Sequence, residues 1–206
     1  MQKKIHGLFP VPIMLCELGR NLTKKEHSKI TEFCSNTTEN VSNRTSKNSY
    51  VLEDKALSNL HDDIQLLINE YVKEIINPIN NINPYITQSW LNITKAGEYH
   101  HKHSHANSYI SGVFYIEADE HNDAIKFFKP CNQYQQIKLE PKDWNLYNSD
   151  SWWFSVKKGL IVLFPSYLEH MVEIKQGNNK RISLAFNTFI KGNLGSKKDL
   201  TELILK

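Results

Sequence analysis

The fold is decided by the stretch Gly159-Leu160-Ile161-Val162-Leu163-Phe164-Pro165-Ser166-Tyr167-Leu168-Glu169-His170, which reads as an apolar strand, a turn and one histidine. Eleven residues on, Arg181-Ile182-Ser183-Leu184-Ala185-Phe186-Asn187 alternates as a second strand, with Arg181, Ser183 and Asn187 on one face. An arginine that shares an interior with a histidine requires an anion, because an unpaired buried guanidinium costs too much free energy. A carboxylate-bearing ligand is the natural partner, since guanidinium binds a carboxylate through two parallel hydrogen bonds.

Alternation with period two extends outward from this stretch and predicts a strand-rich region from Tyr85 onward. The predicted strands are Ile86–Lys95, Ser108–Glu117, Ala124–Lys129, Gly159–Phe164, Met171–Lys175 and Arg181–Ile190. Gly112, inside one of them, is expected to relieve packing. The aromatic stretch from Trp144 to Phe154 interrupts the strands, as a packed insert or as a loop over a cleft. Trp144, Trp152 and Trp153 could shape substrate access, but packing is the favoured interpretation.

The first third of the chain is predicted to be mainly helical. Leu8–Leu15 contains two prolines and suits an edge strand. Thr23 to Glu26 forms a capping box that opens a helix to about Phe33, and the polar Ser35–Ser49 is predicted to be a surface loop. A second helix, ending before Pro78, carries one apolar stripe. The stripe consists of Leu57, Leu60, Ile64, Leu67, Ile68, Tyr71 and Ile75. Helices followed by short strands predict an α+β, mainly β, domain with the helices packed outside.

The composition excludes some classes of protein. The 206 residues suit one domain, and the net charge of +3 is too small and scattered to predict a nucleic-acid or membrane surface. Three separated cysteines, Cys16, Cys34 and Cys131, favour reduced thiols over a disulfide framework. No apolar run is long enough to span a bilayer, so a cytoplasmic protein is expected. A homodimer is compatible with the sequence, which does not fix the oligomeric state.

Four histidines fall within six positions: His100, His101, His103 and His105. Imidazole is the commonest protein ligand for iron, zinc, copper and nickel. On a strand, His101, His103 and His105 would share one face and His100 would lie on the other. A solvated histidine-rich loop without a ligand role is the competing interpretation.

Together these motifs resemble a known family. H-x-H, then G-x-[aliphatic]-x-x-F-P-x-x-x-x-H, then R-x-S is similar to the core of the Fe(II)/2-oxoglutarate-dependent dioxygenases. More narrowly, His103-Ser104-His105-Ala106-Asn107-Ser108, Ser111-Gly112-Val113-Phe114-Tyr115 and Arg181–Asn187 resemble the 2OG-Fe(II) oxygenase family common in marine bacteria and their phages. The resemblance runs from about Phe9 to Ile190. It implies a single domain, 1–206, with a double-stranded β-helix (jelly-roll, cupin-like) core at 85–192. An N-terminal strand and helical flank, 1–84, and a C-terminal tail, 193–206, complete it.

The resemblance implies His103 and His170 as Fe(II) ligands. It places His105 where most of the superfamily has Asp or Glu, and the usual facial triad is two histidines and one carboxylate. A three-histidine site of His103, His105 and His170 is the preferred arrangement.

Two other ligand arrangements stay open. His105 could be a non-ligand, and Glu98, Glu169 or a water would then be the third ligand of the metal. Alternatively, His101 and His103 could be the ligand pair, and His105 would contact these ligands without binding the metal.

The resemblance also makes Arg181 the clamp for the distal carboxylate of 2-oxoglutarate, with the Ser183 hydroxyl beside it. Asn92 and Tyr115 are further expected co-substrate contacts. The implied enzyme uses Fe(II), 2-oxoglutarate and O2 to hydroxylate an unidentified peptide residue, nucleobase or small metabolite, with release of succinate and CO2. Two alternatives remain: a cupin-like three-histidine metalloenzyme that does not use 2-oxoglutarate, and a non-catalytic binding module. Loss of 2-oxoglutarate binding in Arg181→Ala would separate the first enzyme from the second.

Overall fold

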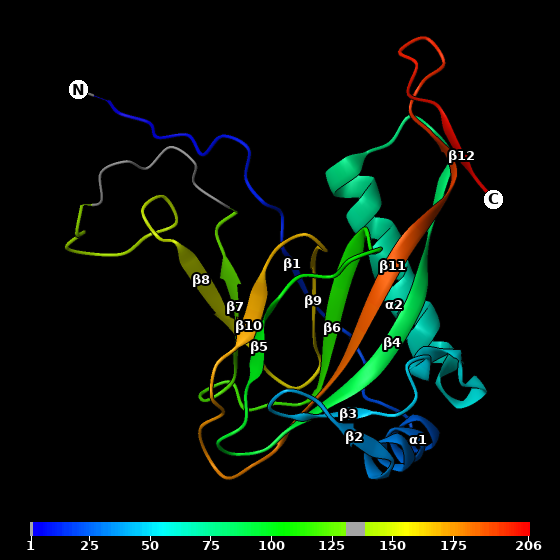
Figure 1. Cartoon of the computed structure of the whole chain (residues 1–206), viewed down its shortest axis with the longest axis vertical. Helices are drawn as coiled ribbons and strands as arrows, with labels where there is room; N and C mark the ends of the chain where they lie inside the picture. The colour runs from blue at the N-terminus through cyan, green and yellow to red at the C-terminus, as the bar shows by residue number, and fades with distance from the viewer. Residues whose placement is uncertain (1, 131–138) are drawn as a thin grey trace.

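The computed structural model describes residues 2–130 and 139–206, so Cys131 lies outside the described residues. Two antiparallel sheets face each other (Figure 1). The larger sheet has the order β1-β9-β6-β11-β4-β3-β2, with β12 paired to β11, and the smaller has the order β5-β10-β7-β8. The larger sheet contains β1 (Met14–Glu17), β2 (Thr37–Glu39), β3 (Arg44–Ser46), β4 (Ile82–Thr94), β6 (Ile110–Glu117), β9 (Leu160–Pro165), β11 (Arg181–Leu194) and β12 (Leu203–Leu205). The smaller contains β5 (His100–His103), β7 (Ala124–Phe128), β8 (Ser151–Ser155) and β10 (His170–Val172).

Strand alternation gives the larger sheet two different faces. Phe114 and Leu184 point to the face covered by the helices, where they join one buried apolar cluster. Tyr115 and Phe164 point to the smaller sheet and join a second cluster. The rings of Phe164 and Phe127, one from each sheet, lie 5.0 Å apart between centroids. The face between the sheets is therefore the interior into which a ligand pocket can open.

The helices cover the outer face of the larger sheet. Helix α1 (Lys24–Ser35) begins at the predicted capping box of Thr23 and Glu26. Helix α2 (Ser58–Tyr71) follows two short 3-10 turns, η1 (Val51–Glu53) and η2 (Lys55–Leu57), and ends in the π-helical turn η3 (Val72–Ile76). No helix in the described residues combines the length and apolarity needed to cross a membrane. The predicted α+β, mainly β, architecture is confirmed.

The apolar stripe of α2 ends earlier than predicted. Ile75 was expected to continue it but is 43% exposed, whereas Val72 is buried. A π-helical turn contains an extra residue, so the side chain that faces the sheet changes after Tyr71.

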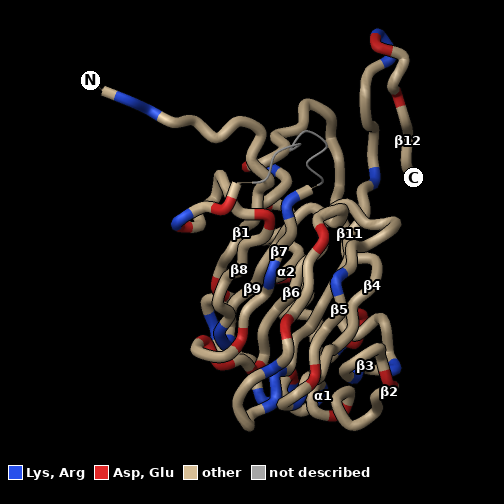
Figure 2. Tube along the Cα trace, turned by 60° about the vertical axis from the view of Figure 1, so that its left-hand side comes forward, with Lys and Arg blue, Asp and Glu red and all other residues tan. Residues whose placement is uncertain are grey.

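Two segments predicted as irregular contribute strands. Ser35–Ser49 contains the β2–β3 hairpin, which pairs with β4 and buries Asn43 and Ser46, so it is not a surface loop. Trp144–Phe154 contains β8, which pairs with β7 along its length. Trp144 and Trp153 are 57% and 60% exposed, so the packing interpretation is wrong for these two rings. Basic and acidic residues are interspersed along the trace (Figure 2), as the scattered charge of the sequence predicts.

Gly112 makes room for a close contact inside the larger sheet. A Cβ atom at this position would overlap Cζ of Phe186 and lie 2.7 Å from Cδ2 of Leu163. We expect Gly112→Ala to lower the free energy of unfolding by about 1–3 kcal/mol, the usual effect of overpacking a core. Urea denaturation checks this, with Gly7→Ala as control because a Cβ there meets only Tyr147, at 3.6 Å. Equal unfolding free energies for wild type and Gly112→Ala would contradict it.

Candidate metal centre

Three histidines from two neighbouring strands converge between the sheets. His103 ends β5, His105 follows it, and His170 begins β10. The register of β5 and β10 places His103 directly opposite His170. One ring nitrogen from each of the three lies within 4.8 Å of the others, and the Nε2 atoms of His105 and His170 are 3.3 Å apart. This spacing suits three ligands of one metal ion.

Hydrogen bonds fix the protonated nitrogen in two of these rings. Nδ1 of His103 lies 2.8 Å from the carbonyl oxygen of His101, and Nδ1 of His170 lies 3.0 Å from that of Leu168. A carbonyl only accepts, so Nδ1 of each ring carries the proton and donates it. The lone pair of each Nε2 is then free for a metal. Such an outer hydrogen bond is characteristic of metal-binding histidines.

Burial keeps these rings neutral. It lowers the pKa of His170 to about 3 and that of His105 to about 4, and it also lowers the pKa of His103. Neutral imidazole is the form that binds metal ions.

The same burial predicts a pH dependence for the metal-free protein. Unfolded histidine titrates near 6.5, well above the pKa of His105 and His170 in the fold. As the pH falls below about 6.5 the unfolded chain therefore binds protons that the folded chain does not, and stability falls. We expect the unfolding free energy of the apoprotein to be level near pH 8 and to decrease between about pH 6.5 and 5. Urea denaturation across this range measures it, and a level profile would contradict it. His105→Gln is expected to show a shallower decrease.

The carboxylates considered as a third ligand are engaged elsewhere. Oε2 of Glu98 accepts a hydrogen bond from the backbone N–H of Lys95 at 2.8 Å. Glu169 is half exposed and pairs with Lys102 at 2.7 Å. These contacts favour the three-histidine arrangement.

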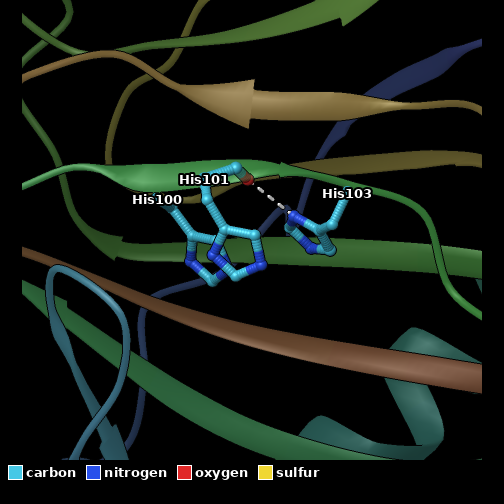
Figure 3. A group of neighbouring side chains, drawn as sticks. All are labelled: His100, His101 and His103. Atoms are coloured by element: carbon cyan, nitrogen blue, oxygen red, sulfur yellow. Dashed lines mark hydrogen bonds between the residues drawn. The ribbon is translucent and has the colours of Figure 1, made fainter.

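The expected alternation fails at His100, whose ring lies on the same side of β5 as the rings of His101 and His103, with centroids 5.1 and 4.6 Å away. His100, and not His101, lines the pocket with His103 and His105. In the β5–β10 pairing, His103 lies opposite His170 and His100 lies opposite Val172. Three residues along β5 therefore span the same length as two along β10. This β-bulge interrupts the expected alternation. His100, His101 and His103 also lie close enough to form a second potential metal-binding group (Figure 3), but that group shares His103 with the first.

Arg181 lies in a buried ionic network. Its Nη1 is 3.2 Å from Oδ1 of Asp123, and Nζ of Lys175 is 3.1 Å from the same oxygen. Each of these three residues is at most 3% exposed. Two cations share one carboxylate, so the network keeps one net positive charge beside the pocket. The predicted need of Arg181 for an anion is thus met only in part by the protein.

Ser183, Asn92 and Tyr115 form a row across three adjacent strands. Ser183 of β11 lies opposite Asn92 of β4 on one side and Tyr115 of β6 on the other. All three line the pocket together with Arg181 and the histidines. Oδ1 of Asn92 is buried, and no partner for it exists among the described residues. A polar group left in this state is expected to meet a ligand or water.

No sequence pattern indicated a role for Asp123, Lys175 or Asn43. Asp123 stands in the polar run 119–123 and Lys175 follows a short strand, so neither differs from a surface residue in pattern. Their burial arises from contacts between distant segments.

Residues 88–187 match the family described as "Putative 2OG-Fe(II) oxygenase". This match indicates a 2OG-Fe(II) oxygenase. The matched segment of the oxygenase is shorter than the Phe9–Ile190 range of the resemblance, but it contains every predicted ligand and co-substrate contact. No curated protein sequence matches the chain.

Solved structures of other proteins share the fold of the oxygenase. HygX from Streptomyces hygroscopicus, solved with nickel, 2-oxoglutarate and hygromycin B, is 11% identical with a TM-score of 0.56, over 86% of this chain and 82% of its own. A Pseudomonas putida prolyl-4-hydroxylase is 11% identical with a TM-score of 0.54, over 86% and 92%. A 2OG-Fe(II) oxygenase family oxidoreductase from Burkholderia pseudomallei is 10% identical with a TM-score of 0.52, over 85% and 83%. These similarities confirm the predicted jelly-roll core.

Proposed function

We propose that the chain is an Fe(II)- and 2-oxoglutarate-dependent oxygenase in which His103, His105 and His170 hold the iron. The main support for the proposal is the convergence of three neutral imidazoles. In two of them Nδ1 donates a hydrogen bond to a carbonyl oxygen, which leaves Nε2 free to bind a metal. Nitrogen ligands suit Fe(II), and three side chains leave open positions for small molecules. Nickel and 2-oxoglutarate in HygX, a protein of the same fold, support the cofactor assignment.

The lining of the pocket supports a dicarboxylate co-substrate, because the metal ligands and Arg181 line the same pocket. The network of Arg181, Lys175 and Asp123 has one uncompensated positive charge, which a distal carboxylate neutralises. The Ser183 hydroxyl has no partner among the described residues and can donate to the same carboxylate. Asn92 and Tyr115, in the same row, are proposed as further contacts. Their fixed strand positions orient the co-substrate with no rearrangement of the sheet.

Bound iron supplies the redox chemistry by which O2 converts 2-oxoglutarate to succinate and CO2 and hydroxylates a C–H bond of a second substrate. The three histidines would hold the metal, and the carbonyls of His101 and Leu168 keep two of the rings in the correct tautomer and orientation. The apolar contacts of Phe164 and Phe127 with His170 exclude water behind that ring. The second substrate is proposed only by class, as a peptide residue, a nucleobase or a small metabolite. A cytoplasmic location, a homodimer and a phage or marine bacterial origin stay predictions.

Turnover under labelled oxygen tests this function. Incubation with Fe(II), 2-oxoglutarate and 18O2 is expected to yield succinate with one labelled oxygen atom, even without a second substrate, because O2 supplies an oxygen to the new carboxylate. Mass spectrometry measures the label. Iron binding without consumption of 2-oxoglutarate would instead favour the three-histidine metalloenzyme that does not use this co-substrate. Absence of iron binding would favour a non-catalytic module.

A further inference from the structure

A fourth histidine in the pocket has no role in the proposed metal site. The β-bulge in β5 turns His100 toward the interior, where it lines the pocket with Arg181 and Ser183. Its ring stacks on that of His103, with centroids 4.6 Å apart (Figure 3). His100 therefore lines the same pocket as the proposed metal ligands and Arg181.

Contacts from the β2–β3 hairpin fix the proton of His100 on Nε2. Oδ1 of Asn43 accepts a hydrogen bond from Nδ2 of Asn40 at 3.0 Å, so Nδ2 of Asn43 is the end that faces Nδ1 of His100, at 3.3 Å. An amide nitrogen only donates, so Nδ1 of His100 accepts and Nε2 carries the proton. Asn43 is only 4% exposed, which protects this bond from water.

This tautomer is the opposite of the one in the proposed ligands. His103 and His170 carry the proton on Nδ1 and keep Nε2 as an acceptor of a metal. His100 presents an N–H instead, and within the described part of the chain no protein group accepts from it. A donor that lines a cationic pocket suits an oxygen of an anionic ligand.

We propose that Nε2 of His100 donates a hydrogen bond to a carboxylate oxygen of bound 2-oxoglutarate, and that Asn43 is the positioning residue that fixes this donor. The proposal rests on the proposed function, since it needs 2-oxoglutarate to occupy the pocket. It gives the β2–β3 hairpin a part in co-substrate binding, although this hairpin lies outside the segment that matches the oxygenase family.

Binding of 2-oxoglutarate to the nickel-loaded protein tests the proposal without turnover. Calorimetry should give a dissociation constant that rises about 10- to 100-fold in His100→Phe, which keeps a stacking ring but has no donor. His100→Gln, whose amide nitrogen can replace Nε2, should recover most of the affinity. Nickel affinity should stay unchanged in both variants, because His100 is not a proposed ligand.

The role of Asn43 has its own readout. Nitrogen NMR of the imidazoles in the nickel-free, zinc-loaded wild type should show a protonated Nε2 and an unprotonated Nδ1 for His100. Asn43→Ala should mix the two tautomers and weaken 2-oxoglutarate binding less than His100→Phe does. A His100 ring protonated on Nδ1 in the wild type would overturn the proposal.

The calorimetric outcomes distinguish failure of the role proposed for His100 from failure of the proposed function. Tight 2-oxoglutarate binding by both wild type and His100→Phe would overturn the role of His100 and leave the proposed function intact. Nickel binding by wild type without any 2-oxoglutarate binding would overturn both. Equal losses in His100→Phe and His100→Gln would also overturn the role of His100, because they would indicate a packing effect.

Discussion

Arg181→Ala is expected to bind 2-oxoglutarate roughly 100-fold more weakly than the wild type, with its affinity for iron unchanged. Truncation of one partner in a buried charge pair costs about 2–5 kcal/mol, and about 2.8 kcal/mol corresponds to 100-fold. Lys175 still neutralises Asp123 in this variant, since its Nζ lies 3.1 Å from the carboxylate. The fold is therefore expected to tolerate the loss of the arginine, and the effect falls on the co-substrate.

Equilibrium binding to nickel-loaded protein measures this effect. Arg44→Ala is the control, because the Arg44 side chain is partly exposed and, among the described residues, its polar partners are Thr37 and Glu39 on the β2–β3 hairpin. It should bind 2-oxoglutarate within about twofold of wild type, as expected for an exposed pair. Undiminished binding in Arg181→Ala would mean that the buried positive charge serves another purpose.

His170→Ala is expected to weaken Fe(II) binding by more than about 100-fold. Changes in the groups that merely orient a metal ligand cost about 10- to 100-fold in metal affinity, and loss of the ligand itself should exceed this. His170 is the only one of the three proposed ligands that comes from β10, so its removal leaves two ligands from one side of the site.

Anaerobic equilibrium dialysis with Fe(II) measures the loss. His27→Ala is the matched control, because His27 is exposed on α1 and is remote in sequence from the residues that line the pocket. It should bind one iron as the wild type does. If His170→Ala kept full iron affinity, the site of His100, His101 and His103 would become the better assignment.

Strand alternation made most of the core predictable from the sequence. Phe114 and Tyr115 face opposite sides of β6 because neighbouring side chains in a strand always do, and the buried clusters on the two faces follow from this. The grouping of His103, His105 and His170 was predicted from the resemblance to the oxygenase family, which joined the H-x-H pair to the histidine after the turn that follows Phe164. The strand alternation depends on local geometry, which a single sequence contains.

Features that depend on pairing between distant segments were not predictable. The bulge that brings His100 into the pocket is a mismatch between β5 and β10, and neither strand alone encodes it. The π-helical turn after Tyr71, which buries Val72 in place of Ile75, is likewise selected by packing on the sheet. Asp123, Lys175 and Asn43 are buried by neighbours remote in sequence. Their polarity indicated a surface position. Their hydrogen-bond and ion-pair partners in the fold offset the free-energy cost of burying these polar groups.

An anaerobic titration of the apoprotein with Fe(II) and then 2-oxoglutarate tests the central claim most directly. Chelation of a 2-oxo acid by Fe(II) gives a visible charge-transfer band that neither component gives alone. We expect this band at one iron per chain in the wild type, its absence in His170→Ala and a weakened band in Arg181→Ala at equal 2-oxoglutarate. Stoichiometric iron binding with no band at saturating 2-oxoglutarate would contradict the proposed function.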